Sequence, residues 1–224
     1  MIDDKYIYSN NRIRQLKNNW FDLLERLAAE VNLGHKIFTA LINSYSAEAR
    51  TYHNLEHIYN ILNLIEQINK VSININILHF SAWFHDYIYV PQAQDNEFKS
   101  AVVASRILAQ LNIKADIVNA VNKIILSTKN HQPLLDSPEN LLFLDMDLAI
   151  LGTTSNQYQK YAVAIRKEYN YLSDRDYQVG RKKVLNQFLA RKKIYYTDYF
   201  YQRLESIARN NIRAEINNLN SDNF

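Results

Sequence analysis

Four short clusters of histidine and acidic side chains could do chemistry in this chain. They occupy residues 52–57 (Tyr-His-Asn-Leu-Glu-His), 85–86 (His-Asp), 95–97 (Asp-Asn-Glu) and 145–148 (Asp-Met-Asp-Leu). The second and fourth clusters belong to almost wholly apolar stretches, so we expect their side chains to be buried. A buried charge is costly unless it is paired or binds a metal. One divalent cation shared by three helices would satisfy the buried His, His-Asp and Asp-x-Asp groups together. Nitrogen and oxygen ligands suit Mn, Fe, Co, Ni, Zn or Mg without selecting among them.

The spacing within the clusters limits which side chains can meet one ion. His53 and His57 are four residues apart, which places them within about 40° on one helix face. Adjacent residues such as His85 and Asp86 diverge by about 100°, yet both can reach an ion at the end of a helix. Asp145 and Asp147 point about 200° apart on a helix, so only one of them can readily face an ion between the helices.

Composition predicts the elements that carry these clusters. The 224 residues include only 3 Gly and 3 Pro, which disfavours a sheet protein with many hairpins. We expect an all-α bundle forming one domain over residues 1–224, with a metal-site core at about 45–170 and C-terminal helices at about 171–219. Apolar spacing places the helices at about 10–30, 33–44, 52–68, 75–88, 96–111, 114–127, 139–151, 155–171, 175–193 and 197–218, with a loop at 90–95.

Other features of the composition exclude classes of site and partner. The absence of cysteine excludes disulfides and thiolate metal sites. The acidic N-terminus has no apolar run after it, and no stretch reaches the length of a membrane span, so we expect a cytoplasmic protein without a membrane partner. Two Arg-Lys-Lys triplets, at 181–183 and 191–193, lie roughly 80° apart around a helix. We interpret them as a solvated face, so nucleic acid is not the expected partner; the alternative is a role in attracting phosphate substrates or nucleic acid.

The order His…His-Asp…Asp resembles that of the HD-domain superfamily of metal-dependent phosphohydrolases, and the interval from His57 to His85 (85 − 57 = 28 residues) is typical of it. The similarity is closest to a bacterial subfamily of predicted HD phosphohydrolases. The shared pieces span about residues 50–170 and comprise Tyr-His-Asn at 52–54 with His57, Trp-Phe-His-Asp at 83–86, Asn-Glu at 96–97 with Ser-Ala at 100–101, Thr128 with His131, the stretch 143–152, and Ile-Arg-x-Glu-Tyr at 165–169.

The resemblance implies an HD-type helical bundle whose divalent metal is bound by His57, His85, Asp86 and Asp147. The ligating Asp of the superfamily often precedes a Leu and a small residue, as Asp147 does, whereas Asp145 precedes Met. We therefore expect Asp147 to be the ligand. Asp145 would then need another partner, either an Arg or a backbone donor elsewhere in the bundle.

Catalytic roles follow from the same resemblance and from the chemistry of phosphoester hydrolysis. The opening Tyr-His-Asn-x-x-His is similar to that of cyclic nucleotide phosphodiesterases, which implies that His53 protonates the leaving oxygen while His57 binds metal. The alternative for His53 is a capping role or support of a metal ligand. The rest of the phosphodiesterase pattern is missing, so a cyclic nucleotide is not implied. Asp86 can orient the attacking water while it binds the metal. Glu97 is a candidate to activate that water or support a metal-binding His; the alternative is a plain helix N-terminal carboxylate.

Four further residues are candidate substrate contacts. His131 follows Lys129 in a polar loop, and some HD proteins use a later His for substrate or for a second metal. Lys129, Arg166 and Arg181 could contact phosphate, and the alternative for the two arginines is a helix salt bridge.

Two classes of function stay open at this point. The first is a phosphohydrolase that cleaves a phosphomonoester, a nucleotide or a related phosphoester with water activated at the metal. The second is a regulatory module that keeps the metal site and senses a nucleotide without significant turnover. Either class predicts a small phosphorylated partner, and an oligomer is compatible with both.

Overall fold

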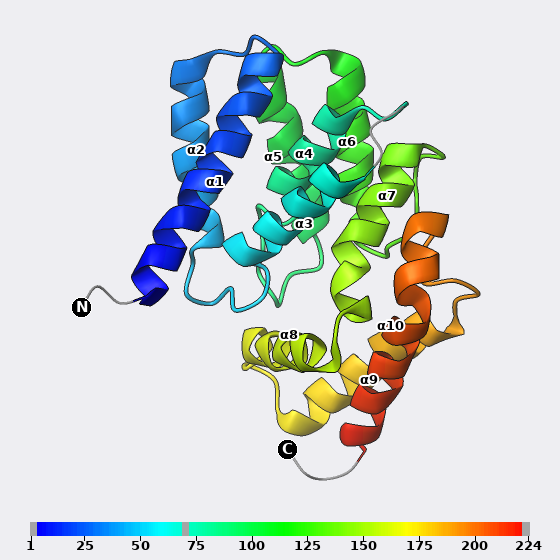
Figure 1. Ribbon diagram of the computed structural model, residues 1–224. Helices are drawn as coiled ribbons and strands as arrows, with labels where there is room; N and C mark the ends of the chain where they lie inside the picture. The colour runs from blue at the N-terminus through cyan, green and yellow to red at the C-terminus, as the bar shows by residue number, and fades with distance from the viewer. Residues whose placement is uncertain (1–3, 69–71, 221–224) are drawn as a thin grey trace.

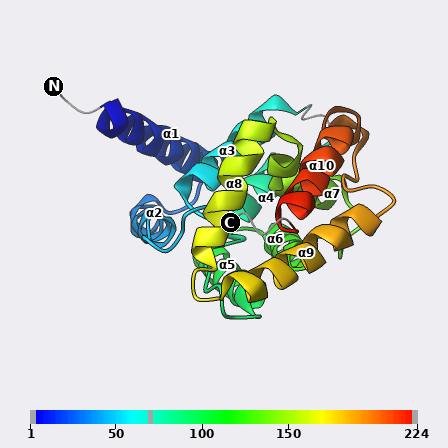
Figure 2. The same cartoon turned by 90° about the horizontal axis from the view of Figure 1, so that it is seen from below.

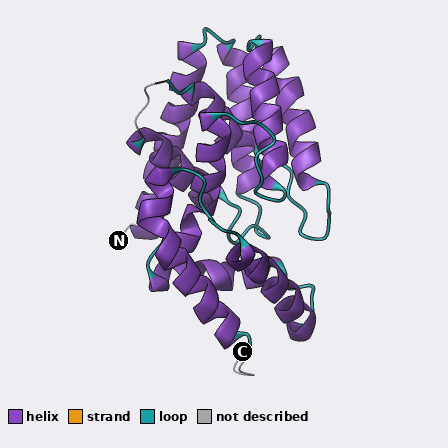
Figure 3. Cartoon of the chain, turned by 90° about the vertical axis from the view of Figure 1, so that its right-hand side faces the viewer, coloured by secondary structure: helices purple, strands orange, loops and turns teal. Residues whose placement is uncertain are grey.

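The computed structural model describes residues 4–68 and 72–220, with side chains from residue 11 onward. This part of the chain is all-helical and contains no strand (Figure 3), as the composition predicts. The elements are α1 (Asp4–Arg26), α2 (Val31–Tyr45), α3 (Leu55–Gln67), α4 (Ile75–Phe84), α5 (Asn96–Gln110), α6 (Ala115–Thr128), α7 (Pro138–Asp147), the 3₁₀ helix η1 (Leu148–Gly152), α8 (Ser155–Glu168), α9 (Asp174–Ala190) and α10 (Asp198–Asn218).

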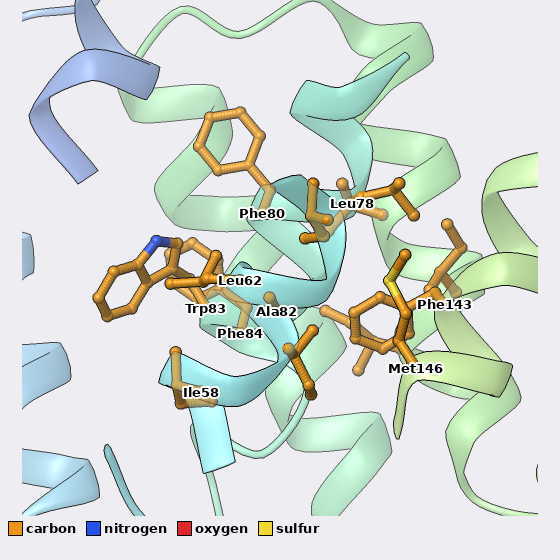
Figure 4. Packing of buried hydrophobic residues seen from close by; sticks show 14 of the residues in the cluster. Ile58, Leu62, Leu78, Phe80, Ala82, Trp83, Phe84, Phe143 and Met146 are labelled. Atoms are coloured by element: carbon orange, nitrogen blue, oxygen red, sulfur yellow. The ribbon is translucent and has the colours of Figure 1, made fainter. Parts of the chain in front are cut away.

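Helix α4 lies at the centre of the bundle and contacts α3, α5, α6 and α7 (Figure 1). Its residues are apolar almost all round, and Phe80 and Trp83 have no exposed surface. Figure 4 shows these two side chains on one side of α4 and Phe143 and Met146 of α7 on the other. Burying each large apolar side chain contributes about 1.5–3 kcal/mol, so packing fixes α4 on every side. The end of α4 is therefore a rigid place from which to present His85.

Capping decides where the helix before α4 begins, and it corrects an expectation. Helix α3 begins at Leu55 rather than at residue 52, because the side chain of Asn54 accepts hydrogen bonds from the backbone N–H groups of Glu56 and His57. His53 thus precedes the helix, and the prediction that His53 and His57 share one helical face is wrong. The two rings still lie near each other, with centroids 5.9 Å apart.

Two other expected helices end early at the site. Helix α4 ends at Phe84 rather than at residue 88, so His85 and Asp86 sit at the start of a turn. The expected helix 139–151 divides into α7, which ends at Asp147, and η1. Ser137 caps α7, and Pro138 occupies its first position, where a missing N–H costs nothing. Both changes place an acidic candidate ligand at a helix end.

Helices α8, α9 and α10 form a second layer beneath the bundle (Figures 1 and 2). Helix α7 runs down toward this layer, and α10 packs against η1, α8 and α9. Helix α9 contacts α10, and only Tyr177 and Leu185 of its residues are buried. No helix in the described residues combines the length and apolar character that crossing a membrane requires.

Candidate metal centre and its cavity

Four side chains from three parts of the bundle converge where α3, α4 and α7 meet. The Nε2 atoms of His57 and His85 are 3.1 Å apart, and Asp147 Oδ1 lies 3.2 Å from the first and 3.6 Å from the second. Ligand atoms of these three residues all lie within 4.8 Å of one another. Asp86 Oδ2 approaches His85 Nε2 to 3.0 Å and His57 Nε2 to 3.7 Å. The cluster His57, His85 and Asp147 could therefore hold a metal ion, with Asp86 beside it.

The hydrogen bonds of His85 show which ring atom faces the cluster. Its Nδ1 lies 3.1 Å from the carbonyl oxygen of Ala82, which can only accept, so Nδ1 carries the proton. In the neutral ring, Nε2 then presents its lone pair to His57 and the carboxylates. A backbone partner on the far nitrogen is the arrangement that orients metal-binding histidines in proteins.

The two carboxylates of the centre are held ionised. Burial raises the pKa of Asp147, but hydrogen bonds to His131, His57 and His85 outweigh burial and hold that pKa well below its usual value. Burial also raises the pKa of Asp86, but the charge of His85 is the chief effect that outweighs burial and lowers that pKa below its usual value. Burial lowers the pKa of His85, but Asp86 and Asp147 outweigh it and raise that pKa well above the usual value. Two negative charges thus face the space between the histidines.

Arg50 supports the turn that carries His85 and Asp86, and sequence reasoning missed it. This buried arginine donates from Nη1 to the carbonyl oxygens of Asp86 (2.6 Å) and His53 (3.2 Å). Its Nη2 donates to Tyr87 O at 2.8 Å and to Ser44 Oγ at 3.0 Å. Arg50 therefore joins the segment before α3 to the turn after α4, and so links His53 to Asp86. No local pattern marks it, because its partners lie up to 37 residues away.

Asp145 and Asp147 lie on opposite sides of α7, as the helical spacing predicts. Asp145 has no exposed surface, and its carboxylate accepts hydrogen bonds from the backbone N–H groups of Tyr196 and Thr197, each at 2.7 Å, and from the Thr197 hydroxyl. Burial raises the pKa of Asp145 to about 6 in spite of these donors. The expected backbone donor is thus found, in the segment before α10. Only Asp147 faces the two histidines.

His53 is tied to a buried glutamate that sequence reasoning did not single out. His53 Nδ1 lies 2.6 Å from Glu168 Oε2, which also accepts from the Tyr89 hydroxyl at 2.8 Å. The other oxygen, Oε1, accepts from the backbone N–H groups of Tyr52 and His53. Burial lowers the pKa of His53, but Asp86 and Glu168 outweigh burial and raise it. The proton on Nδ1 faces Glu168, so Nε2 is the ring atom that can deliver a proton elsewhere.

His131 reaches the centre from a turn after α6. Its backbone has a φ of 46°, in the left-handed region that residues other than glycine rarely adopt. Its Nε2 lies 3.1 Å from Asp147 Oδ2, the oxygen that does not face His57. The carbonyl oxygen of His131 accepts from Arg191 Nη1 at 3.0 Å and from the Tyr196 hydroxyl at 2.9 Å. The strained turn is therefore held from the segment that joins α9 to α10.

The centre opens into a cavity of about 920 Å³ between the bundle and the second layer. Seven of the predicted site residues line this cavity. Two are the aspartates of the metal centre, Asp86 and Asp147, and the other five are His53, Glu97, Lys129, His131 and Arg181. Its volume lies at the upper end of the range of about 300–1,000 Å³ that is usual for small-molecule sites. The cavity is therefore large enough for an organic phosphate and not only for an inorganic ion.

The predicted substrate-binding cations differ in what they contact. Arg166 does not line the cavity; it donates to two carbonyl oxygens and pairs with Asp174 at 2.7 Å, which favours the salt-bridge alternative. Arg181 lines the cavity but forms two hydrogen bonds with the buried carboxylate of Glu215. Lys129 donates to the carbonyl oxygen of Gln94, and Arg191, from the second basic triplet, also lines the cavity. Neither Lys129 nor Arg191 has a carboxylate partner within the described part of the chain.

Comparison with family models, with characterised proteins and with solved structures gives no match to this chain.

Proposed function

We propose that this protein is a metal-dependent phosphohydrolase of the HD superfamily that cleaves a phosphomonoester, a nucleotide or a related phosphoester. The observation that carries the proposal is that one cavity is lined both by Asp147 of the His57–His85–Asp147 cluster and by the Glu168-bound His53. A ligand set and a proton donor on the same cavity are what hydrolysis of a phosphoester requires. A purely structural metal site would need the ligand set but no proton donor.

The donor set fits a divalent cation. Two imidazole nitrogens face each other at 3.1 Å with a carboxylate oxygen near each, which is the mixed nitrogen and oxygen donor set that divalent transition-metal ions accept. His57, His85 and Asp147 would hold the ion, with Asp86 as the fourth ligand. When bound, a divalent ion would lower the pKa of water and offset negative charge on phosphoryl oxygens.

The protein's own groups supply the remaining work. Lys129 and Arg191 can bind phosphoryl oxygens as they enter, because both line the cavity and neither is neutralised by a carboxylate among the described residues. Asp86 can orient water in the cavity. His53, kept protonated on Nδ1 by Glu168, can donate the proton on Nε2 to the departing oxygen.

The decisive experiment measures phosphate release from a panel of nucleotides and simple phosphoesters, with protein loaded with Mn²⁺ and with chelated protein as the reference. The Asp86→Ala variant should lose at least about a thousandfold in activity, roughly 4 kcal/mol of barrier. The matched control is Asp116→Ala, which removes an exposed aspartate of α6 that does not line the cavity and should leave activity unchanged. Activity that survives both chelation and Asp86→Ala would refute the proposal. Tight nucleotide binding without turnover would instead favour a sensing module.

A further inference from the structure

The chain has only three glycines, and two of them have an evident packing reason. A Cβ atom on Gly34 would collide with the side chain of Leu24, and one on Gly152 would collide with Leu204. A Cβ atom on Gly180 would have no heavy atom within 4 Å. None of the three has a positive φ, so the backbone does not require glycine either.

Gly180 is unusual because it lies in the interior of α9, where glycine is less favourable than alanine. Together with Tyr177, Arg181 and Val184, one turn or less away, it lines the cavity. Gly180 is exposed, so its missing side chain leaves space open where α9 lines the cavity, and no neighbouring protein group fills that space.

An aromatic path leads from the metal cluster to α9, the helix that carries Gly180. The ring of Tyr52 lies 5.0 Å from that of His57, and Tyr161 lies 4.6 Å from Tyr52. The Arg181 guanidinium then lies 5.2 Å from the Tyr161 ring. Tyr52, Tyr161 and Arg181, with the buried Tyr177 on α9, are called here the aromatic wall. All four line the cavity.

Charge divides the cavity into two parts. Lys129, His131 and Arg191 lie at the Asp147 side, where a phosphoryl group would be bound. At the aromatic wall, by contrast, the Glu215 carboxylate neutralises Arg181, and Arg181 Nη1 donates to the Tyr161 hydroxyl at 3.3 Å. The aromatic wall therefore carries tyrosine rings and a cation that is already paired, which favours contact with an aromatic group over binding of a second anion.

We propose that Gly180 is a specificity-determining residue: it keeps open a subsite beside the aromatic wall that receives a flat aromatic group of the bound phosphoester. This inference rests on the proposed function, because that function supplies the phosphate group of the ligand. The inference adds two points. It names the part of the cavity that selects the organic group of the ligand, and it names the residue that makes room for that group.

The test compares adenosine 5′-monophosphate with ribose 5-phosphate, which differ in the aromatic base alone. Their affinities for the metal-free protein are measured by calorimetry, and phosphate release is measured separately with Mn²⁺. Wild-type protein should bind the nucleotide about tenfold or more tightly than the sugar phosphate, as expected for one stacked base. Gly180→Leu should remove that preference and leave the affinity for ribose 5-phosphate within about twofold.

Two further variants separate subsite loss from damage to the fold. Gly180→Ala should melt at or above the wild-type temperature, because alanine favours the helix, yet it should weaken nucleotide binding. Asn186→Leu places the same bulk as Gly180→Leu at an exposed position of α9 that does not line the cavity, and it should bind like wild type.

Two results would overturn this inference. Wild-type protein could bind both probes with equal affinity, or Gly180→Leu could lose affinity for both probes equally. Absence of phosphate release from every substrate, with the binding preference intact, overturns the proposed hydrolysis alone.

Discussion

Two aspartates separated by a single residue have different surroundings in this protein. Asp147 faces His57, His85 and His131, whereas Asp145 accepts hydrogen bonds from the segment before α10. At the scale of single residues, position around the α7 axis thus separates a candidate ligand from a structural group. The same distinction applies to His57, which joins the cluster, and His53, which pairs with Glu168.

The aspartate pair gives a direct test of the ligand assignment. Asp147→Asn should abolish tight metal binding with little effect on folding. Asp145→Asn should retain the metal, with at most about a 10–100-fold lower affinity, but lose about 1–3 kcal/mol of stability, because a buried acceptor is replaced by a donor. Metal content and urea denaturation of both variants check this. The reverse pattern would show that the register of α7 has been misassigned.

Glu168 is expected to act through His53. An acid must be protonated to work, and Glu168 helps to raise the pKa of His53, so it extends activity to higher pH. Glu168→Gln should therefore shift the basic limb of the rate profile to lower pH and reduce kcat by about 10–100-fold, part of a general acid's usual contribution. Metal content should not change. Glu48→Gln, at an exposed site, is the control, and an unshifted profile would exclude this role for Glu168.

At the scale of elements, the segment joining α9 to α10 holds two parts of the site at once. Arg191 and Tyr196 hold the carbonyl oxygen of the strained His131, and Tyr196 and Thr197 hold Asp145 through their N–H groups. A connection that lies far from the cluster in sequence thus positions both the His131 turn and α7. The C-terminal layer is therefore part of the site and not an appendage.

Arg191 tests this coupling. Arg191→Ala removes the donors to Asn130 O and His131 O, so it should cost about 1–2 kcal/mol of stability and lower metal affinity about tenfold, since His131 no longer orients Asp147. Denaturation and metal titration measure the two effects. Lys193→Ala also removes one positive charge from this segment, but at an exposed side chain, and it should change neither quantity. Equal effects of the two variants would mean that net charge alone matters.

At the scale of the whole molecule, the cluster joins helices from both ends of the metal-site core, so binding should stabilise the fold. A ligand that binds only the folded state adds about 2.7 kcal/mol at a hundredfold excess over its Kd. The melting temperature should rise with added Mn²⁺ and fall on chelation. His57→Ala should lose the response, whereas His35→Ala, at an exposed position of α2, should keep it. A metal-independent melting temperature in wild type would argue against the centre.

The fold class and most of the helices could be predicted from the amino-acid sequence. Apolar residues at helical spacing and a shortage of Gly and Pro act within a few residues, so the all-α architecture and elements such as α5 and α10 could be predicted closely. Buried polar residues in apolar stretches indicated a shared metal ion, and the family resemblance named His57, His85 and Asp147 among its ligands. Helical geometry predicted that only one of Asp145 and Asp147 faces the histidines, and the resemblance selected Asp147.

The ends of these helices at the site, and the residues that support it, became visible only in the folded chain. The cap at Asn54 removed His53 from α3, although the residue type could have signalled it. Glu168 lies 115 residues from His53, and Arg191 lies 60 residues from His131. Such pairings depend on how helices pack across the whole chain, which no local pattern encodes. The open space beside Gly180 is likewise visible only once α9 lies over the cavity.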